Sequence, residues 1–196
     1  MRFILIASLV TTVLVTIGCS TPKGTLPSEK AASIQLMHDE SMPMFIERHP
    51  EIRELVAKSY GYALLSRDNL TIWFAGFGGG YGVAVENSTG KRTYLKDAHI
   101  NLDLGFDFRD YRSLLIFNNA LAFKNYLTGS WDCGVNAEVA LTSRDRWFED
   151  SAENTFLNGV TYYEFTDSGG ALRLGLPLYN VTPWTELNAL PAPAAK

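Results

Sequence analysis

The chain has 196 residues, of which 46% are hydrophobic and 19% are charged, and its 17 basic residues stand against 21 acidic ones. This length predicts one domain with an ordinary hydrophobic core. The net charge of −4 argues against broad, sequence-independent binding to nucleic acid. The two cysteines are too few for a disulfide scaffold or for a zinc site made of cysteines alone, and no cofactor is expected.

The N-terminus has the features of a secretion signal. An apolar run over 3–15 is too short to span a bilayer, and small residues follow it up to Cys19. The stretch resembles a bacterial lipoprotein signal, although Thr16 stands where leucine is usual. This resemblance implies a signal peptide of residues 1–18 and acyl chains on Cys19. The alternative is ordinary secretion with cleavage elsewhere and no role for the cysteine.

The mature chain is expected to have unstructured segments at both ends. Residues 19–27 have little to bury and indicate a tether between the lipid and the domain. Because Ser20 follows the cysteine, the resemblance to lipoproteins implies a lipid-anchored protein of the bacterial envelope, on the outer membrane and facing the periplasm. Residues 189–196, rich in Pro and Ala, are expected to form a disordered tail. A single domain over 28–188 remains.

The N-terminal third of the domain is predicted to be helical. Ser28 can cap a helix, and the apolar residues that follow it keep a helical spacing. Pro43 and Pro50 each suit the first turn of a new helix and would break a continuous one. We expect the apolar stripes to cover the core; a membrane-inserting surface helix is the alternative. A further helix is predicted over 118–127, with an asparagine at its start.

From Tyr60 onward the apolar residues alternate, which predicts strands. A first strand over 60–65 is followed by turn residues at 66–69 and by a second strand from Leu70. Further turn signals lie at 86–91 and 167–170. Because these links are short, the strands are expected to pair in antiparallel fashion.

A glycine-rich strand over 73–85 is the most informative segment. It lacks the closing Gly-Lys-Ser/Thr of a phosphate-binding loop and the glycine spacing of a dinucleotide site. With a period of two, one face consists of four glycines: Gly76, Gly78, Gly80 and Gly82. Glycine weakens a strand unless something approaches its backbone closely. Packing of a helix or crossing strand is favoured there over a ligand.

The strand over 97–110 alternates between an apolar side and a polar side. His99, Asp103 and Asp107 share the polar side, which raises the hypothesis of a metal site. The stretch lacks the glycine and the closing glutamate of an EF-hand loop. We therefore expect this side to be a solvated face and assign no metal to it.

Catalytic patterns are sparse in this sequence. The three histidines His38, His49 and His99 belong to no His-Glu-x-x-His pair, and there is no Gly-x-Ser-x-Gly elbow. Cys133 alternates with apolar residues and is expected to be a buried thiol rather than a nucleophile. The sequence gives no positive evidence for an enzyme.

The order of five sequence blocks resembles the SYLF domain, a lipid-binding family related to actin-patch proteins. The blocks are 57–65, 74–85, 100–105, 114–118 and 131–135, and the likeness runs from about residue 45 to residue 188. The resemblance implies binding to phospholipid membranes, and bacterial relatives are often small envelope lipoproteins.

Five basic residues are candidates for contact with lipid headgroups: Lys58, Arg67, Lys91, Arg92 and Lys96. The acidic balance of the chain argues against strong recognition of anionic headgroups, which need clustered Lys and Arg.

These observations predict an α+β domain. Its N-terminal helices pack on a mainly antiparallel, curved β-sheet or partial barrel, with one further helix near 118–127. The expected function is that of a non-enzymatic envelope protein that binds membrane phospholipid or stabilises membrane-associated assemblies, with an envelope protein as a second candidate partner. The alternative is a hydrolase acting on envelope lipid or peptidoglycan through the polar strand face around His99.

Overall fold

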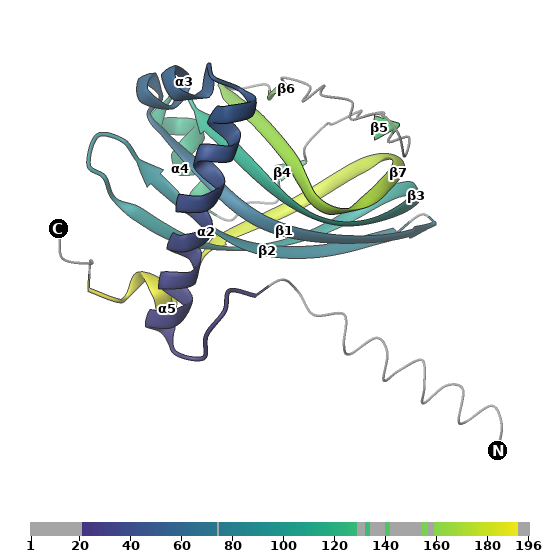
Figure 1. Ribbon diagram of the computed structural model, residues 1–196, viewed down its shortest axis with the longest axis horizontal. Coiled ribbons are helices and arrows are strands. Elements are labelled where there is room, and N and C mark those ends of the chain that lie inside the picture. The colour runs from purple at the N-terminus through teal and green to yellow at the C-terminus, as the bar shows by residue number, and fades with distance from the viewer. Residues whose placement is uncertain are drawn as a thin grey trace.

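The computed structural model describes residues 21–73, 75–128, 132–133, 140–141, 154–156 and 159–191. N-terminal helices pack on a curved antiparallel sheet that does not close on itself (Figure 1), which confirms the expected α+β class. The signal peptide, Cys19, Ser20 and the last part of the C-terminal tail lie outside the described residues.

Helix α2 (Pro27–Arg48) runs without a break through Pro43, so the predicted helix boundary at this proline is wrong. A proline inside a helix removes one backbone hydrogen bond and crowds the preceding turn. Phe45, two residues further on, is 1% exposed in the core beneath the helix. Its burial favours continuation of the helix past the proline. Helix α3 (Ile52–Lys58) begins soon after Pro50, as the sequence predicts.

Strands β1 (Gly61–Trp73) and β2 (Ala75–Glu86) form a long hairpin. The turn predicted at 66–69 is wrong, because β1 continues through these residues and the chain reverses around Trp73 instead. Trp73 has a φ of 66°, in the left-handed region. The polar residues at 66–69 do not mark a turn, since side chains such as Arg67 are buried inside the fold.

Strands β3 (Arg92–Phe117) and β7 (Val160–Pro183) form a long antiparallel ribbon. The first part of β3 pairs with β2, and its second part pairs with β1. Since β1 and β2 are themselves antiparallel, β3 has to reverse its direction, and the ribbon bends around the tip of the hairpin (Figure 1). The predicted turn at 86–91 is confirmed between β2 and β3.

The turn predicted at 167–170 is wrong. Strand β7 stays paired with β3 through this region, and the register shifts once, between Asp110 and Tyr111. On β7 the residues paired with these two are Ser168 and Thr166, so Asp167 is the extra residue of a β-bulge. A bulge absorbs the turn-forming residues without ending the strand.

Helices cover both faces of the sheet, but only in part. The face beneath α2 and α5 (Thr185–Asn188) is here named the convex face, and the other face, against which α4 (Ala120–Leu127) packs, the concave face. Helix α4 confirms the helix predicted over 118–127. Across the concave face, the Arg67 guanidinium on β1 lies 4.5 Å from the ring centroid of Tyr179 on β7, although two strands separate them. The sheet therefore curls around this face.

Three short strands pair with β7: β4 (Asp132–Cys133), β5 (Ala140–Leu141) and β6 (Asn154–Phe156). The side chain of Cys133 lies outside the described residues, so its expected burial stays a prediction. Within the described part of the chain, no helix has both the length and the hydrophobicity needed to cross a membrane.

Candidate functional site

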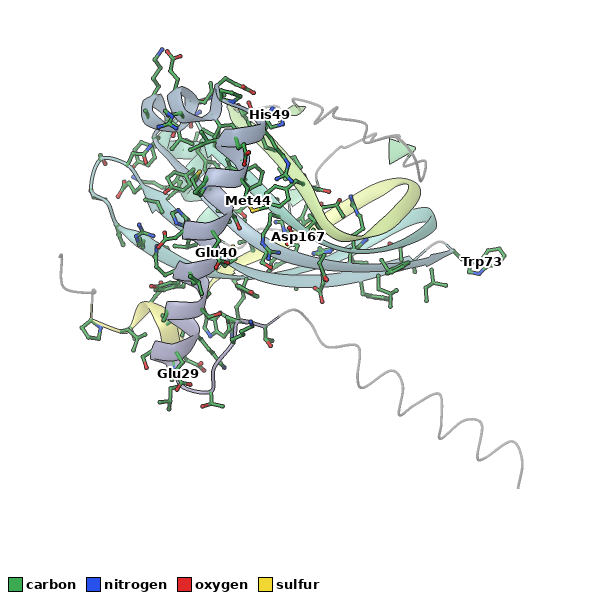
Figure 2. All side chains as sticks on the ribbon, viewed as in Figure 1. Glu29, Glu40, Met44, His49, Trp73 and Asp167 are labelled. Carbon is green, nitrogen blue, oxygen red and sulfur yellow. The ribbon has the colours of Figure 1, made fainter. Side chains whose placement is uncertain are left out.

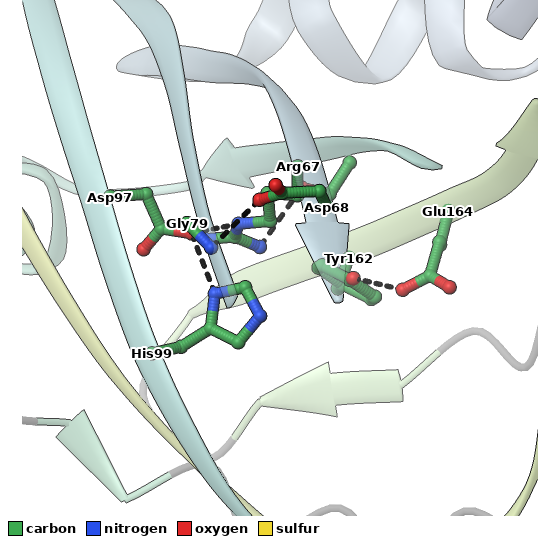
Figure 3. Close-up of polar contacts among 8 residues, drawn as sticks. Arg67, Asp68, Gly79, Asp97, His99, Tyr162 and Glu164 are labelled. Carbon is green, nitrogen blue, oxygen red and sulfur yellow. Dashed lines mark hydrogen bonds and ion pairs between the residues drawn. The ribbon is translucent and has the colours of Figure 1, made fainter. Parts of the chain in front are cut away.

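A buried group of charged and polar side chains lies on the concave face, near the middle of the hairpin. Arg67 Nε donates to Asp97 Oδ2 at 2.7 Å, and Arg67 NH1 donates to Ser113 Oγ at 2.9 Å. His99 Nδ1 lies 3.1 Å from the same Asp97 oxygen. Figure 3 shows Arg67 and His99 both directed at Asp97. We name these four residues the concave cluster.

Electrostatics hold the concave cluster in its charged form. Burial opposes ionisation of Asp97, but the Arg67 guanidinium and the His99 ring outweigh it and keep the pKa of this carboxyl below its ordinary value. Burial likewise opposes the charge on Arg67, whereas Asp97 and nearby tyrosines keep the pKa of the guanidinium well above its ordinary value. The cluster is therefore a buried ion pair with a histidine attached to it.

The glycine face of β2 lies against this cluster. A Cβ atom added at Gly78 would lie 2.0 Å from His99 Nε2, and one added at Gly80 would lie 3.0 Å from Arg67 Cγ. At Gly82 the nearest side-chain atom is Leu65 Cγ, at 2.8 Å. Side chains of the neighbouring strands therefore occupy the space that the glycines leave, and the bare backbone gives room to the concave cluster. Gly76 shares this face by register.

The Asp97–His99 pair has the arrangement in which a carboxylate orients an imidazole. His99 Nε2 has no hydrogen-bond partner among the described residues, but it is buried directly against Gly78. A general base must lie within hydrogen-bond reach of the substrate proton that it removes. The contact with Gly78 leaves no room for a substrate atom on that side of the ring.

The expectation of a solvated polar face is wrong at His99, which is 2% exposed. Asp103 and Asp107 belong to the same strand, but their side chains lie outside the described residues. Within the described part of the chain, no three His, Cys, Asp or Glu side chains are grouped so that they could hold a metal ion.

The other two histidines lie far from the concave cluster. His38 Nε2 lies 2.9 Å from the Tyr62 hydroxyl at the contact between α2 and the sheet, where burial lowers the pKa of the imidazole despite the neighbouring Asp39. His49 follows the end of α2 and lies against the ring of Tyr163. The three histidines thus do not form one site.

Large apolar side chains are exposed at the end of the sheet where the hairpin reverses. Five residues form what we name the apolar tip surface: Ile72, Trp73, Phe77, Ile100 and Phe108, with exposed fractions of 54%, 65%, 65%, 39% and 67%. The backbone register places Phe77 beside Ile100, and it places Leu70 between Phe77 and Phe108. Figure 2 shows Trp73 projecting from the far end of the sheet, away from α2. A continuous exposed apolar area of this kind usually marks a contact with a partner or a membrane.

The apolar tip surface is not predicted by the sequence. The alternation in β3 predicts two different faces, with the polar one toward the solvent. At His99 the polar side faces the protein interior, whereas Ile100 and Phe108 of the apolar side are exposed. A signal for the true direction lies on β1, where Arg67 and Asn69 continue the same polar face. Polar residues on two paired strands indicate that this face has polar partners within the fold.

The structure does not gather the five candidate headgroup contacts into one surface. Arg67 is buried in the concave cluster. Lys58 ends α3, and Lys91 and Arg92 lie at the turn between β2 and β3. Lys96 is exposed on the convex face, with its Nζ over the ring of Trp184. The turn with Lys91 and Arg92 is at the opposite end of the hairpin from Trp73.

Comparison with known proteins gives one informative similarity. The chain matches no protein-family model. It is similar to Beta cell expansion factor A of Aeromonas veronii, with 27% identity over 143 residues. The match covers 72% of this chain and 52% of that protein, so the chain spans about half the length of this relative. The similarity therefore extends over a domain-sized segment of both chains.

Proposed function

We propose that this protein is a non-enzymatic, lipid-anchored protein of the bacterial envelope that binds phospholipid membranes through the apolar tip surface. The observation that carries the proposal is the exposure of five large apolar side chains at one end of the sheet. Removing one such side chain from water contributes about 1.5–3 kcal/mol. Together they provide a driving force for partition into a bilayer.

The chemistry of the tip supports a lipid partner. Trp73 is the outermost of the labelled side chains (Figure 2), and tryptophan is enriched where membranes meet water because its ring is apolar and its N–H is polar. The resemblance of the sequence blocks to SYLF domains supports the same class of partner. An envelope protein that docks on this surface, in a membrane-associated assembly, is the second kind of partner in the proposal.

The proposed anchor strengthens such a contact. Acyl chains on Cys19 would hold the domain beside the outer membrane, on its periplasmic side. A tethered domain meets the lipid surface at a high effective concentration, so a modest affinity of the tip is sufficient.

The vesicle-binding test replaces Phe77 and Phe108 by serine. We expect vesicle affinity to fall by about 100-fold in the double variant, since each exposed aromatic contributes about 1.4 kcal/mol or more to burial. The protein is the mature chain with Cys19→Ser, so that acyl chains do not contribute, and flotation with phospholipid vesicles measures binding. Leu121→Ser is the matched control, because Leu121 is 70% exposed on α4, away from the tip. Equal binding by the double variant and the control would contradict the proposal.

The anchor is tested by Cys19→Ala. We expect this variant to lose incorporation of a radiolabelled fatty acid, because no other cysteine lies near the signal. Fractionation of cells should find the wild-type protein, with its acyl chains, in the outer membrane. Label that persists in the variant would argue against the anchor, and protein confined to the inner membrane would argue against the sorting.

A further inference from the structure

Among the described side chains of the convex face, the first charged ones behind the apolar tip surface are acidic. On the convex face, Asp68 of β1 is the backbone partner of Asp110 of β3, and each lies two residues behind an apolar residue of the tip region, Leu70 and Phe108 respectively. Asp68 Oδ1 accepts a hydrogen bond from the Gly79 backbone N–H at 2.9 Å, which fixes its position. The apolar end of the sheet is therefore bordered by two neighbouring carboxylates.

Two arginines described near these carboxylates, Arg112 and Arg109, are each engaged by another carboxylate. Arg112 NH1 lies 2.8 Å from Asp167 Oδ2, and Arg109 NH1 lies 2.8 Å from Glu164 Oε1. Burial raises the pKa of the Asp167 carboxyl, and the charge of Asp110 adds to this effect against the opposing charge of Arg112. Among these described side chains, carboxylates thus outnumber cations beside the tip.

Strand geometry sets the depth of these charges. A strand rises about 3.3 Å per residue, so Asp68 lies about 7 Å behind Leu70, whereas Lys96 lies about 13 Å behind Ile100. The stretch from Leu70 to Trp73 is about 10 Å long by the same rise, comparable to the depth at which interfacial segments enter a membrane and far short of a hydrocarbon core of about 30 Å. When the apolar tip surface is embedded in one leaflet, the two carboxylates lie at the level of the headgroups.

We infer that the partner of the apolar tip surface is a leaflet of zwitterionic phospholipid and that anionic lipid weakens the contact. The inference rests on the proposed function and specifies its lipid. Cations near an anionic leaflet are attracted to it, and carboxylates at the same level are repelled. The apolar tip surface supplies the affinity, and Asp68 and Asp110 select against negative headgroups.

The test compares vesicles of phosphatidylcholine with vesicles that also contain phosphatidylglycerol. For the mature chain with Cys19→Ser at low salt, we expect binding to be several-fold tighter to phosphatidylcholine. High salt should remove the difference, because it screens exposed charges. Tighter binding to the anionic vesicles would overturn the inference and leave the proposed function intact. Failure to bind either vesicle would overturn the proposed function as well.

A charge reversal assigns the selectivity to the border of the tip. Asp110→Lys is expected to reverse the preference, with a change of about tenfold or more in the ratio of the two affinities, because two units of charge change at the headgroup level. Asp68→Asn, which keeps an acceptor for the Gly79 N–H, is expected to reduce the discrimination. Glu54→Lys is the matched control, since it changes net charge equally on the exposed surface of α3. An equal effect of Glu54→Lys and Asp110→Lys would overturn the inference.

Discussion

Replacing Gly78 by alanine is expected to destabilise the domain by about 3 kcal/mol or more, since overpacking a filled interior forces backbone shifts. The new Cβ would lie 2.0 Å from His99 Nε2 and 2.2 Å from the Asp68 carbonyl oxygen. The histidine is held by Asp97 and the carbonyl belongs to the paired strand, so neither can move without loss elsewhere. For a domain of this size, the melting temperature should fall by about 6–12 °C.

Two substitutions separate this clash from other effects. Ala98→Val adds a larger group on the exposed convex side of β3 and should change stability by less than about 0.5 kcal/mol. Gly90→Ala meets no atom within 4 Å, but its φ of +67° makes any side chain unfavourable, at a cost of about 1 kcal/mol. Thermal and urea unfolding followed by circular dichroism provide the comparison. Were Gly78→Ala to unfold at the wild-type temperature, the close packing of His99 on the glycine face would not exist in solution.

Replacing Arg67 by methionine is expected to destabilise the domain by about 3–5 kcal/mol, because it leaves the buried carboxylate of Asp97 without its cation. The dependence of stability on pH should also change sign. In the wild type the pKa of Asp97 is lowered, so its contribution is present above the ordinary carboxyl pKa of about 4 and is lost as the pH falls below it. In the variant, burial without Arg67 raises that pKa, and stability should fall as the pH rises above about 4.

The double variant Arg67→Met with Asp97→Asn tests the coupling between the two residues. We expect it to be more stable at neutral pH than Arg67→Met alone, because no uncompensated charge is then buried. Urea unfolding between acidic and neutral pH measures the free energy of unfolding of each variant and the slope of this free energy against pH. Strictly additive losses in the double variant, or an unchanged slope in Arg67→Met, would show that the ion pair does not hold the concave face together.

Local patterns predict which helices and strands form in this fold better than they predict where each of them ends. The helix at 118–127 and the turn at 86–91 follow from capping and turn residues that lie next to each other in the sequence. The residues at 66–69 mislead, because the polarity of Arg67 is explained by partners 30 and 46 positions away. Pro43 and Asp167 mislead for a similar reason, since packing and pairing with distant residues override the local preference.

The sequence also predicts the alternation in β3 but not its direction. A period of two shows that two faces differ, and it does not show which one faces the interior. In most domains the apolar side is buried, and this rule places Ile100 and Phe108 in the core. Here the concave cluster occupies the interior around His99, so Ile100 and Phe108 on the apolar side are exposed to solvent. The part of the site that could not be predicted is therefore the part on which the proposed function depends.

The ribbon that bends around the hairpin tip also determines how the chain folds. The hairpin of β1 and β2 joins neighbouring segments and can form early, whereas β7 pairs with β3 across the whole stretch that contains α4. Pairing of strands so distant in the sequence costs loop-closure entropy before the new contacts stabilise the domain, so folding is slow. Until β7 arrives, both halves of β3 present unpaired edges that can join another chain. The last strand therefore decides whether the domain closes or aggregates.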